Sequence, residues 1–169
     1  MKYLLKTDRL ALRHFDIPDA PFMVELMNSK GWLEFIGDRN VRTVEDAEAY
    51  LLNGPIKSYR ENGFGMSLVS LKSDNTPIGA CGLLKRDYLE HPDIGFAFLP
   101  GHIGNGYGYE SASAILTHAK DTLKIDHVLA FSVPFNVASI KLLEKLGFHF
   151  EKAFTMPGEE EELYLFSNS

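Results

Sequence analysis

Apolar and polar positions follow two different periods along this chain. Stretches in which they alternate predict β-strands, because successive side chains of a strand point to opposite faces of a sheet. Such strands are expected at residues 9–15, 66–72 and 94–99, with residues 78–85 as the hairpin partner of 66–72 and a last hairpin whose halves begin near Phe148 and Leu163. Residues 126–133 contain a continuous apolar run, which suits a strand buried on both faces. Stretches in which apolar residues recur every three or four positions predict helices with one buried face. The expected helices are residues 19–28, a segment capped by Thr43, residues 56–62, a segment from the glycines before Tyr109 through Leu123, and a segment between Asn136 and Gly147.

Strands and helices in this succession indicate an α/β protein. The length of 169 residues suits one domain, residues 1–169, with a full hydrophobic core. Residues 29–42 follow neither period and are expected to be irregular, although they carry the aromatic side chains Trp32 and Phe35.

Four glycines lie between the expected strand at residues 94–99 and the helix that follows it. They are Gly101, Gly104, Gly106 and Gly108. Glycine lets a backbone turn tightly and approach a ligand closely, and the N–H groups in the first turn of a helix have no partner within that helix. A strand, glycine loop and helix in this order suit a phosphate or pyrophosphate, so the loop is a candidate anion site.

Two common phosphate-binding motifs do not fit this loop. The loop of nucleoside triphosphatases requires G-x-x-x-x-G-K-[ST], and no Gly-Lys pair in the chain is followed by Ser or Thr. The dinucleotide motif requires G-x-G-x-x-G, but Tyr109 stands where the third glycine belongs, and the loop comes too late for a full doubly wound sheet to follow. A nicotinamide cofactor is therefore a weak alternative.

The loop and two further segments resemble the GNAT N-acetyltransferases. Residues 104–111, G-N-G-Y-G-Y-E-S, are similar to the family's acetyl-coenzyme A (acetyl-CoA) loop, G-x-G-[YF]-[AG]-x-E-A. Residues 136–148 match the family's second motif, N-x-x-S-x-x-L-L-x-x-L-G-F. Residues 7–13, T-D-R-L-A-L-R, resemble the start of the branch that includes the ribosomal-protein N-terminal (RimJ/RimL-like) acetyltransferases. The resemblance spans nearly the whole chain.

The resemblance implies a fold and a way of binding the coenzyme. The fold is a mixed, splayed central β-sheet flanked by α-helices, with the pantetheine arm of acetyl-CoA in the gap between two parallel strands. Main-chain groups would contact this arm, and the pyrophosphate would lie over the amides of the glycine loop. The coenzyme-binding residues that the resemblance implies are Phe98, Leu99, Gly104, Asn105, Gly106, Tyr107, Gly108, Asn136 and Ser139. It implies no metal.

The resemblance also implies a general acid. Some relatives protonate the leaving thiolate with a serine at the position of Ser139, and many others use a tyrosine four residues before the glycine of the second motif. Leu143 occupies that tyrosine position here, so Ser139 is the expected general acid.

Glu90 and His91 are candidate general bases, because they lie close in sequence to the strand before the glycine loop. The need for a base depends on the acceptor amine. A protein α-amino group, with a pKa of about 7.7 to 8.0, is partly neutral near pH 7, whereas lysine, with a pKa of about 10.4, is almost wholly charged. In the resembling family the region around Trp32 and Phe35 borders the acceptor pocket, so both are expected to bind substrate.

Charge and cysteine content narrow the class further. The chain has 17 Lys and Arg against 23 Asp and Glu, and a net charge of −6 argues against nonspecific nucleic-acid binding. The acidic residues 159–162 in the last hairpin would favour a cationic acceptor if they border its site. The single cysteine, Cys81, has no disulfide partner and is expected in the core. The N-terminus has no apolar run of signal-peptide length, so a cytoplasmic location is expected, with no membrane partner.

These observations predict an acetyl-CoA-dependent N-acetyltransferase. It would act on a primary amine, either a protein N-terminus or a small molecule, by direct transfer within a ternary complex, as a monomer or homodimer. The alternative is a module that binds or senses acyl-CoA without transferring the acyl group.

Overall fold

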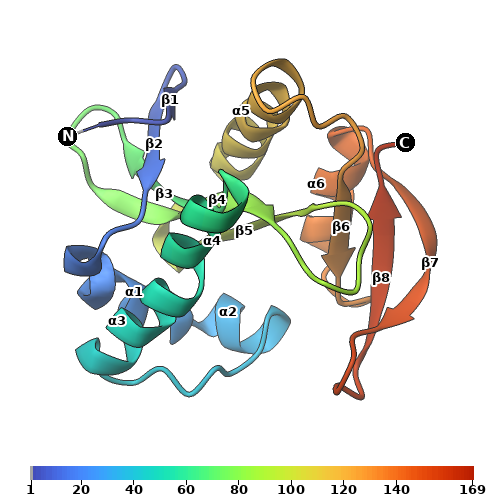
Figure 1. Ribbon diagram of the computed structural model, residues 1–169, viewed down its shortest axis with the longest axis horizontal. Coiled ribbons are helices and arrows are strands. Elements are labelled where there is room, and N and C mark those ends of the chain that lie inside the picture. Colours follow the sequence, from blue (N-terminus) through green and yellow to red (C-terminus); the bar gives the residue numbers. More distant parts are fainter. Residues whose placement is uncertain (1) are drawn as a thin grey trace.

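A mixed β-sheet organises the fold. The computed structural model describes residues 2–169, and within them eight strands pair in the order β1-β2-β3-β4-β5-β6-β8-β7. The strands are β1 Leu5–Lys6, β2 Leu10–His14, β3 Met66–Leu71, β4 Pro77–Leu84, β5 Asp93–Phe98, β6 Leu129–Ser132, β7 His149–Thr155 and β8 Glu162–Ser167. The sheet runs across the whole molecule, with the N-terminal strands at one end and the last hairpin at the other (Figure 1).

Helices cover the two faces of the sheet. The α-helices are α1 Ala20–Met27, α2 Lys30–Phe35, α3 Val44–Asn53, α4 Pro55–Asn62, α5 Tyr107–Asp121 and α6 Val137–Lys145. Two short 3-10 helices, Ile17–Asp19 and Pro100–His102, precede α1 and α5. One core cluster joins α5 and α6 to the sheet, and a second joins α1, α2 and α3 to the opposite face. In Figure 1 the helix α5 lies above the strands β3 to β5, and α1, α2 and α3 lie below them.

The sheet splays between β5 and β6. These strands are parallel, and they are paired only through Asp93 with Leu129 and through Ile94 with Ala130. Beyond Ile94, β5 stays paired with β4 while β6 stays paired with β8. A gap therefore opens between the C-terminal halves of β5 and β6, which confirms the mixed, splayed α/β sheet expected from the sequence.

Local sequence signals place most of these elements. The Thr43 side chain accepts a hydrogen bond from the N–H of Asp46 and begins α3, the Asn136 side chain caps α6 in the same way, and Gly147 follows α6 with a φ of +96°. The last hairpin turns at residues 156–158 and carries a bulge between Phe150 and Lys152 on its outer strand, β7.

The expectation of an irregular segment at residues 29–42 was wrong in part, because Lys30–Phe35 forms α2. Trp32 is only 7% exposed and packs into the core cluster beside α1 and α3. This burial stabilises a helix of six residues whose N-cap, Ser29, makes no side-chain cap bond. Tertiary packing therefore outweighs a weak local signal.

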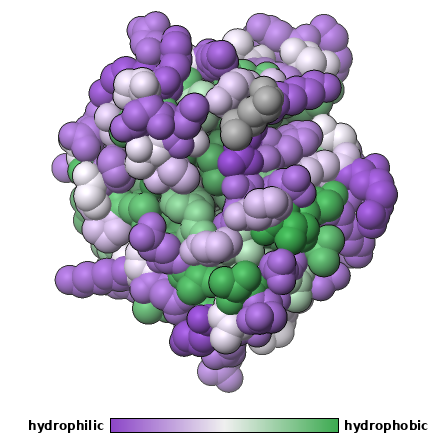
Figure 2. All heavy atoms as spheres, turned by 90° about the vertical axis from the view of Figure 1, so that its left-hand side faces the viewer, coloured by the Kyte–Doolittle hydropathy of each residue, from purple (hydrophilic) through white to green (hydrophobic). Residues whose placement is uncertain are grey.

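The surface on the side of β1 and α1 is mainly hydrophilic, and hydrophobic side chains gather there in a band at about mid-height (Figure 2).

Along residues 2–169, none of the helices has the length and apolar character needed to cross a bilayer.

Candidate active site

The glycine loop turns the chain from the end of β5 into α5. Gly104 and Gly106 have φ values of +87° and +83°, which side-chain-bearing residues rarely adopt, and Gly106 is the N-cap of α5. Gly108 is constrained differently. A Cβ there would lie 3.0 Å from the Cδ2 of Leu142 on α6, so the absence of a side chain lets the two helices approach each other.

The N–H groups of this loop are free to bind a ligand. In the described part of the chain, those of residues 104–109 donate to no other protein group, and the first bond of the helix runs from the N–H of Glu110 to the carbonyl of Gly106, over 3.1 Å. Free N–H groups at the positive end of a 15-residue helix attract an anion. The loop therefore suits the pyrophosphate of a nucleotide-derived coenzyme.

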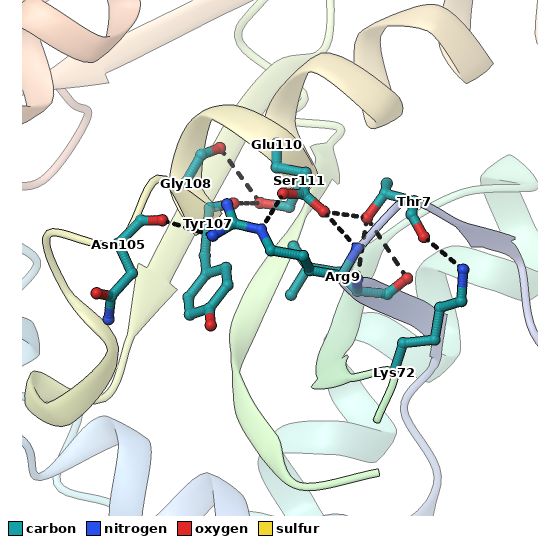
Figure 3. A network of polar contacts seen from close by, with 9 residues as sticks. Thr7, Arg9, Lys72, Asn105, Tyr107, Gly108, Glu110 and Ser111 are labelled. Carbon is teal, nitrogen blue, oxygen red and sulfur yellow. Dashed lines mark hydrogen bonds and ion pairs between the residues drawn. The ribbon is translucent and has the colours of Figure 1, made fainter. Parts of the chain in front are cut away.

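A polar network ties the loop to the N-terminal segment of the chain (Figure 3). The Arg9 side chain donates from Nε to Glu110 over 2.7 Å and from Nη1 to the carbonyl of Asn105 over 2.9 Å. Its guanidinium group stacks over the ring of Tyr107, 4.5 Å from the ring centre. Thr7 donates to Glu110 over 2.5 Å. Partial burial acts to raise the pKa of the Glu110 carboxyl, but the bonds from Thr7 and Arg9 outweigh it and hold that pKa below its ordinary value.

The edge of β5 offers a second set of main-chain donors. The N–H of Leu99 bonds the carbonyl of Ile78, and the carbonyl of Leu99 accepts from the N–H of His102, each over 2.9 Å. Both main-chain groups of Leu99 are therefore used within the protein. Because N–H groups alternate between the two edges of a strand, those of Phe98 and Phe96 face the gap toward β6. Of the two residues expected to offer a main-chain N–H to the coenzyme, Phe98 and Leu99, only Phe98 has an N–H that is directed to the gap.

Two more expected residues lie at the start of α6, which follows the C-terminal end of β6, one of the two strands that border this gap. Asn136 caps α6 by accepting the N–H of Ser139 over 3.2 Å, and Ser139 lies in the first turn, half-buried. The hydroxyl of Ser139 has no hydrogen-bond partner among the bonds within residues 2–169. It is therefore available to a ligand in the gap.

A cavity of about 830 Å³ opens on the sheet face that carries α1 to α4. The side chains of α3 and α4 form one wall, and the end of β4 with residues 85–88 forms the other. Tyr50 and Arg86 line it, and burial raises the pKa of Tyr50. Two of its lining side chains, Met66 and Leu84, lie against Gly95 and so separate the cavity from β5.

An ion pair lies beside this cavity at the point where β5 and β6 part. Arg86 donates to Asp93 from Nε over 2.9 Å and from Nη2 over 3.3 Å, and Asp93 is only 3% exposed. Burial raises the pKa of the Asp93 carboxyl, and the bonds from Arg86 offset only part of this effect.

Two aromatic rings meet where the two arms of the splayed sheet face each other. Phe35, at the end of α2, lies 5.7 Å from Phe135, which follows β6, measured between ring centres. Since α2 contacts β5, this pair spans the gap between β5 and β6. Trp32 is buried in the same helix, and its Nε1 has no hydrogen-bond partner among the described residues.

The remaining expected residues lie away from the glycine loop. Glu90 is exposed, and the ring of His91 stacks on that of His127 with 3.8 Å between ring centres. Both precede Asp93, and a strand the length of β5 spans roughly 17 Å at 3.3 Å per residue. Either residue would therefore need water to relay a proton from an amine near Phe98. Cys81 lies in the core, where burial raises its pKa to about 12, as expected for an unreactive thiol.

Sequence reasoning gave no role to three features of this site: the Arg9–Glu110 pair, the Arg86–Asp93 pair and the Phe35–Phe135 contact. Arg9 lies in the motif at residues 7–13 and Glu110 in the motif at residues 104–111. Because both motifs belong to the same family pattern, they could have indicated that these two residues act together. No sequence signal indicated the other two contacts.

Comparisons with known proteins agree with this geometry. The sequence profile described as "Acetyltransferase (GNAT) domain" matches residues 9–149. The chain is 27% identical to the uncharacterized N-acetyltransferase YnaD of Bacillus subtilis over 151 residues, which cover 89% of this chain and 85% of YnaD. It is 33% identical to the uncharacterized protein YkkB of the same organism over 96 residues, which span only 54% of this chain and 56% of YkkB.

A solved structure shares the whole fold. The RimL ribosomal L7/L12 alpha-N-protein acetyltransferase in complex with coenzyme A superposes with a TM-score of 0.83, over 98% of this chain and 97% of that one. The identity between the two sequences is 18%, so the likeness is one of fold.

Proposed function

Because this chain is an acetyltransferase that belongs to the GNAT domain family, we propose that residues 1–169 form a single N-acetyltransferase domain that moves the acetyl group of acetyl-CoA to a primary amine. One observation carries the proposal. The unpaired N–H groups of residues 104–109 lie at one end of β5, and on the α1–α4 face a cavity of about 830 Å³ is separated from the same strand only by side chains such as Met66 and Leu84.

The coenzyme would lie along the gap between β5 and β6. Its pyrophosphate would accept hydrogen bonds from the N–H groups of Gly104–Gly108. Its pantetheine arm would contact the N–H of Phe98 and the side chains of Asn136 and Ser139. The bound coenzyme supplies an acetyl thioester, which is already activated for transfer to an amine. The protein then contributes mainly by holding the amine against the thioester and by donating a main-chain N–H to the carbonyl oxygen.

The acceptor would enter through the cavity on the α1–α4 face. Trp32 and Phe35 are not among the residues that line this cavity, and Phe35 would meet the acceptor only at the gap between β5 and β6, where it contacts Phe135. The last hairpin borders the cavity, since Glu159 at its tip lies 3.8 Å from Arg39 in the cavity lining. Three further glutamates follow at residues 160–162. Their charge favours a cationic amine over a neutral or anionic one.

A protein N-terminal α-amine is the acceptor that we propose first, and a small-molecule amine is second. The fold likeness to RimL and the resemblance at residues 7–13 favour the first. So does the chemistry, because an α-amine is partly neutral near pH 7 and needs little help from a base.

Proton transfer gives one prediction. We expect Ser139→Ala to lower kcat about tenfold and to raise the KM for acetyl-CoA by less than that, because the hydroxyl would contact the bound coenzyme but would protonate the leaving thiolate only as the bond breaks. Replacing Glu90 or His91 by Gln should affect a lysine acceptor more than an α-amine acceptor. Steady-state rates from pH 6 to 9 measure both effects, with Ser113→Ala, another half-buried helix serine, as the control. Equal effects on both acceptors would remove Glu90 and His91 as bases.

The central test combines coenzyme binding with turnover. At 100 times its dissociation constant, acetyl-CoA should stabilise the protein by about 2.7 kcal/mol and raise its melting temperature by a few degrees. Thiol release should then follow with at least one amine in a panel of N-terminal peptides, lysine peptides and polyamines. No stabilisation at saturating acetyl-CoA would refute the proposal. Stabilisation without thiol release from any amine would favour an acyl-CoA-binding module instead.

A further inference from the structure

We propose that Arg9 is a positioning residue for the coenzyme, which holds the glycine loop in the shape that presents its N–H groups to the pyrophosphate. This inference rests on the proposed function, because it takes coenzyme A as the ligand of the loop. It assigns a role in binding to a residue that precedes β2 and lies 96 residues from Asn105 in the sequence.

The bond from Arg9 to Asn105 fixes the direction of a peptide plane. A trans peptide is planar, so its carbonyl and its N–H point in opposite directions. Arg9 draws the Asn105 carbonyl toward itself over 2.9 Å, and the N–H of Gly106 in the same plane must therefore point away from Arg9. The helix α5 fixes the next peptide plane, which joins Gly106 to Tyr107. The carbonyl of Gly106 accepts from the N–H of Glu110, so the N–H of Tyr107 points the opposite way, out of the N-terminal end of the helix.

Arg9 also cancels a charge that would oppose an anion. Glu110 lies in the first turn of α5, beside the free N–H groups, and its lowered pKa keeps it ionised at neutral pH. An unpaired carboxylate there would repel a pyrophosphate. Its two oxygens instead accept from the Arg9 side chain over 2.7 Å, from the Arg9 main-chain N–H over 2.9 Å and from Thr7 over 2.5 Å.

The protein holds Arg9 itself in place before any ligand arrives. The carbonyl of Arg9 accepts from the N–H of Lys72 over 2.8 Å, and the Nζ of Lys72 bonds the carbonyl of Thr7 over 2.9 Å. Figure 3 shows the side chain running from this anchor between the loop and α5, with the Tyr107 ring beneath it. A Cβ at Gly106 would lie 3.3 Å from the Nη2 of Arg9, so the loop closes tightly around the guanidinium group. The loop is thus preorganised, which lowers the cost of ordering it on binding.

The test compares a coenzyme that has a pyrophosphate with one that lacks it. In Arg9→Gln, we expect the Kd for coenzyme A to rise at least tenfold, measured by calorimetry, while kcat at saturating acetyl-CoA stays within about twofold of wild type. With acetyl-pantetheine, which has no pyrophosphate, kcat/KM should not change. The double variant Arg9→Gln/Glu110→Gln should regain part of the lost affinity, because it removes the carboxylate that Arg9 no longer neutralises.

Two further variants make the result decisive. Arg42→Gln breaks an exposed arginine–carboxylate pair, Arg42–Asp38, of the same kind and should leave the Kd for coenzyme A unchanged. Arg9→Lys keeps the charge but cannot bond two groups in the same plane, so it should fall between wild type and Arg9→Gln, and it replaces Arg9→Gln if that variant does not fold.

The outcomes separate this inference from the proposed function. An unchanged Kd in both Arg9 variants, or an equal loss of activity with acetyl-pantetheine, would overturn the positioning role. A wild-type protein that does not bind coenzyme A would instead overturn the proposed function.

Discussion

Gly106→Glu is expected to lose coenzyme binding, with a rise in the Kd for coenzyme A of more than a hundredfold. Two effects act together. The φ of +83° at Gly106 strains any side-chain-bearing residue by about 1–2 kcal/mol, and the new Cβ would press on the Nη2 of Arg9 at 3.3 Å. In addition, the new carboxylate would stand among the N–H groups that receive the pyrophosphate. Thermal unfolding with and without acetyl-CoA measures the loss directly.

A matched control separates binding from strain. Gly158, in the turn of the last hairpin, has the same φ of +83°, and no atom lies within 4 Å of a Cβ built there. Gly158→Glu introduces the same residue with the same backbone strain, but far from α5 in the sequence. It should lose some stability and keep the coenzyme-induced rise in melting temperature. If Gly106→Glu also kept that rise, the loop would not be the coenzyme site.

Arg86→Met is expected to lower the free energy of unfolding by about 3 kcal/mol at neutral pH. It would leave the Asp93 carboxylate buried without its partner, and an unpaired buried charge is strongly destabilising. The double variant Arg86→Met/Asp93→Leu should recover much of this loss, because no charge then remains buried. Urea denaturation measures all of these changes. The control is Arg42→Met, whose ion pair is about half exposed and should contribute little, because solvent screens it.

The deficit of Arg86→Met should shrink as the pH falls. Burial raises the pKa of Asp93 in the folded protein above its value in the unfolded chain, so the folded protein binds this proton more readily. Protonation of Asp93 therefore adds to the free energy of unfolding. This contribution is fully present below about pH 3.8, the ordinary pKa of the group, and is lost as the pH rises through the pKa of the folded protein. Without Arg86 that folded pKa rises further, so acidification from pH 7.5 to pH 5 should help the variant more than wild type. A deficit that stays constant over this range would contradict the assignment to Asp93.

Most of the fold was predictable because its signals are local. The caps at Thr43 and Asn136, the left-handed Gly147 and the short runs of mainly apolar or small residues in β3 and β4 each depend on a few neighbouring residues. The helix α2 was not predictable, because burial of Trp32 stabilises it and burial depends on distant elements. The two-residue strand β1 is too short to carry a period of its own.

The candidate site divides in the same way. The glycine loop is contiguous in sequence, so its residues could be named before the fold was known. Arg9 and Glu110 are 101 residues apart, and Phe35 and Phe135 come from different arms of the sheet, so their contacts depend on the tertiary structure. Many charged residues could in principle pair with Glu110, and only the fold selects Arg9.

The bulge in β7 bears on the behaviour of the protein at high concentration. An open strand at the end of a sheet offers unpaired main-chain groups on which a second molecule can add its own strand, and this route leads to aggregation. One end of this sheet is β1, which has only two residues, and the other is β7. The bulge between Phe150 and Lys152 bends β7, and Glu151 and Lys152 place charges along it. Neither end of the sheet therefore offers a long, regular template for another chain.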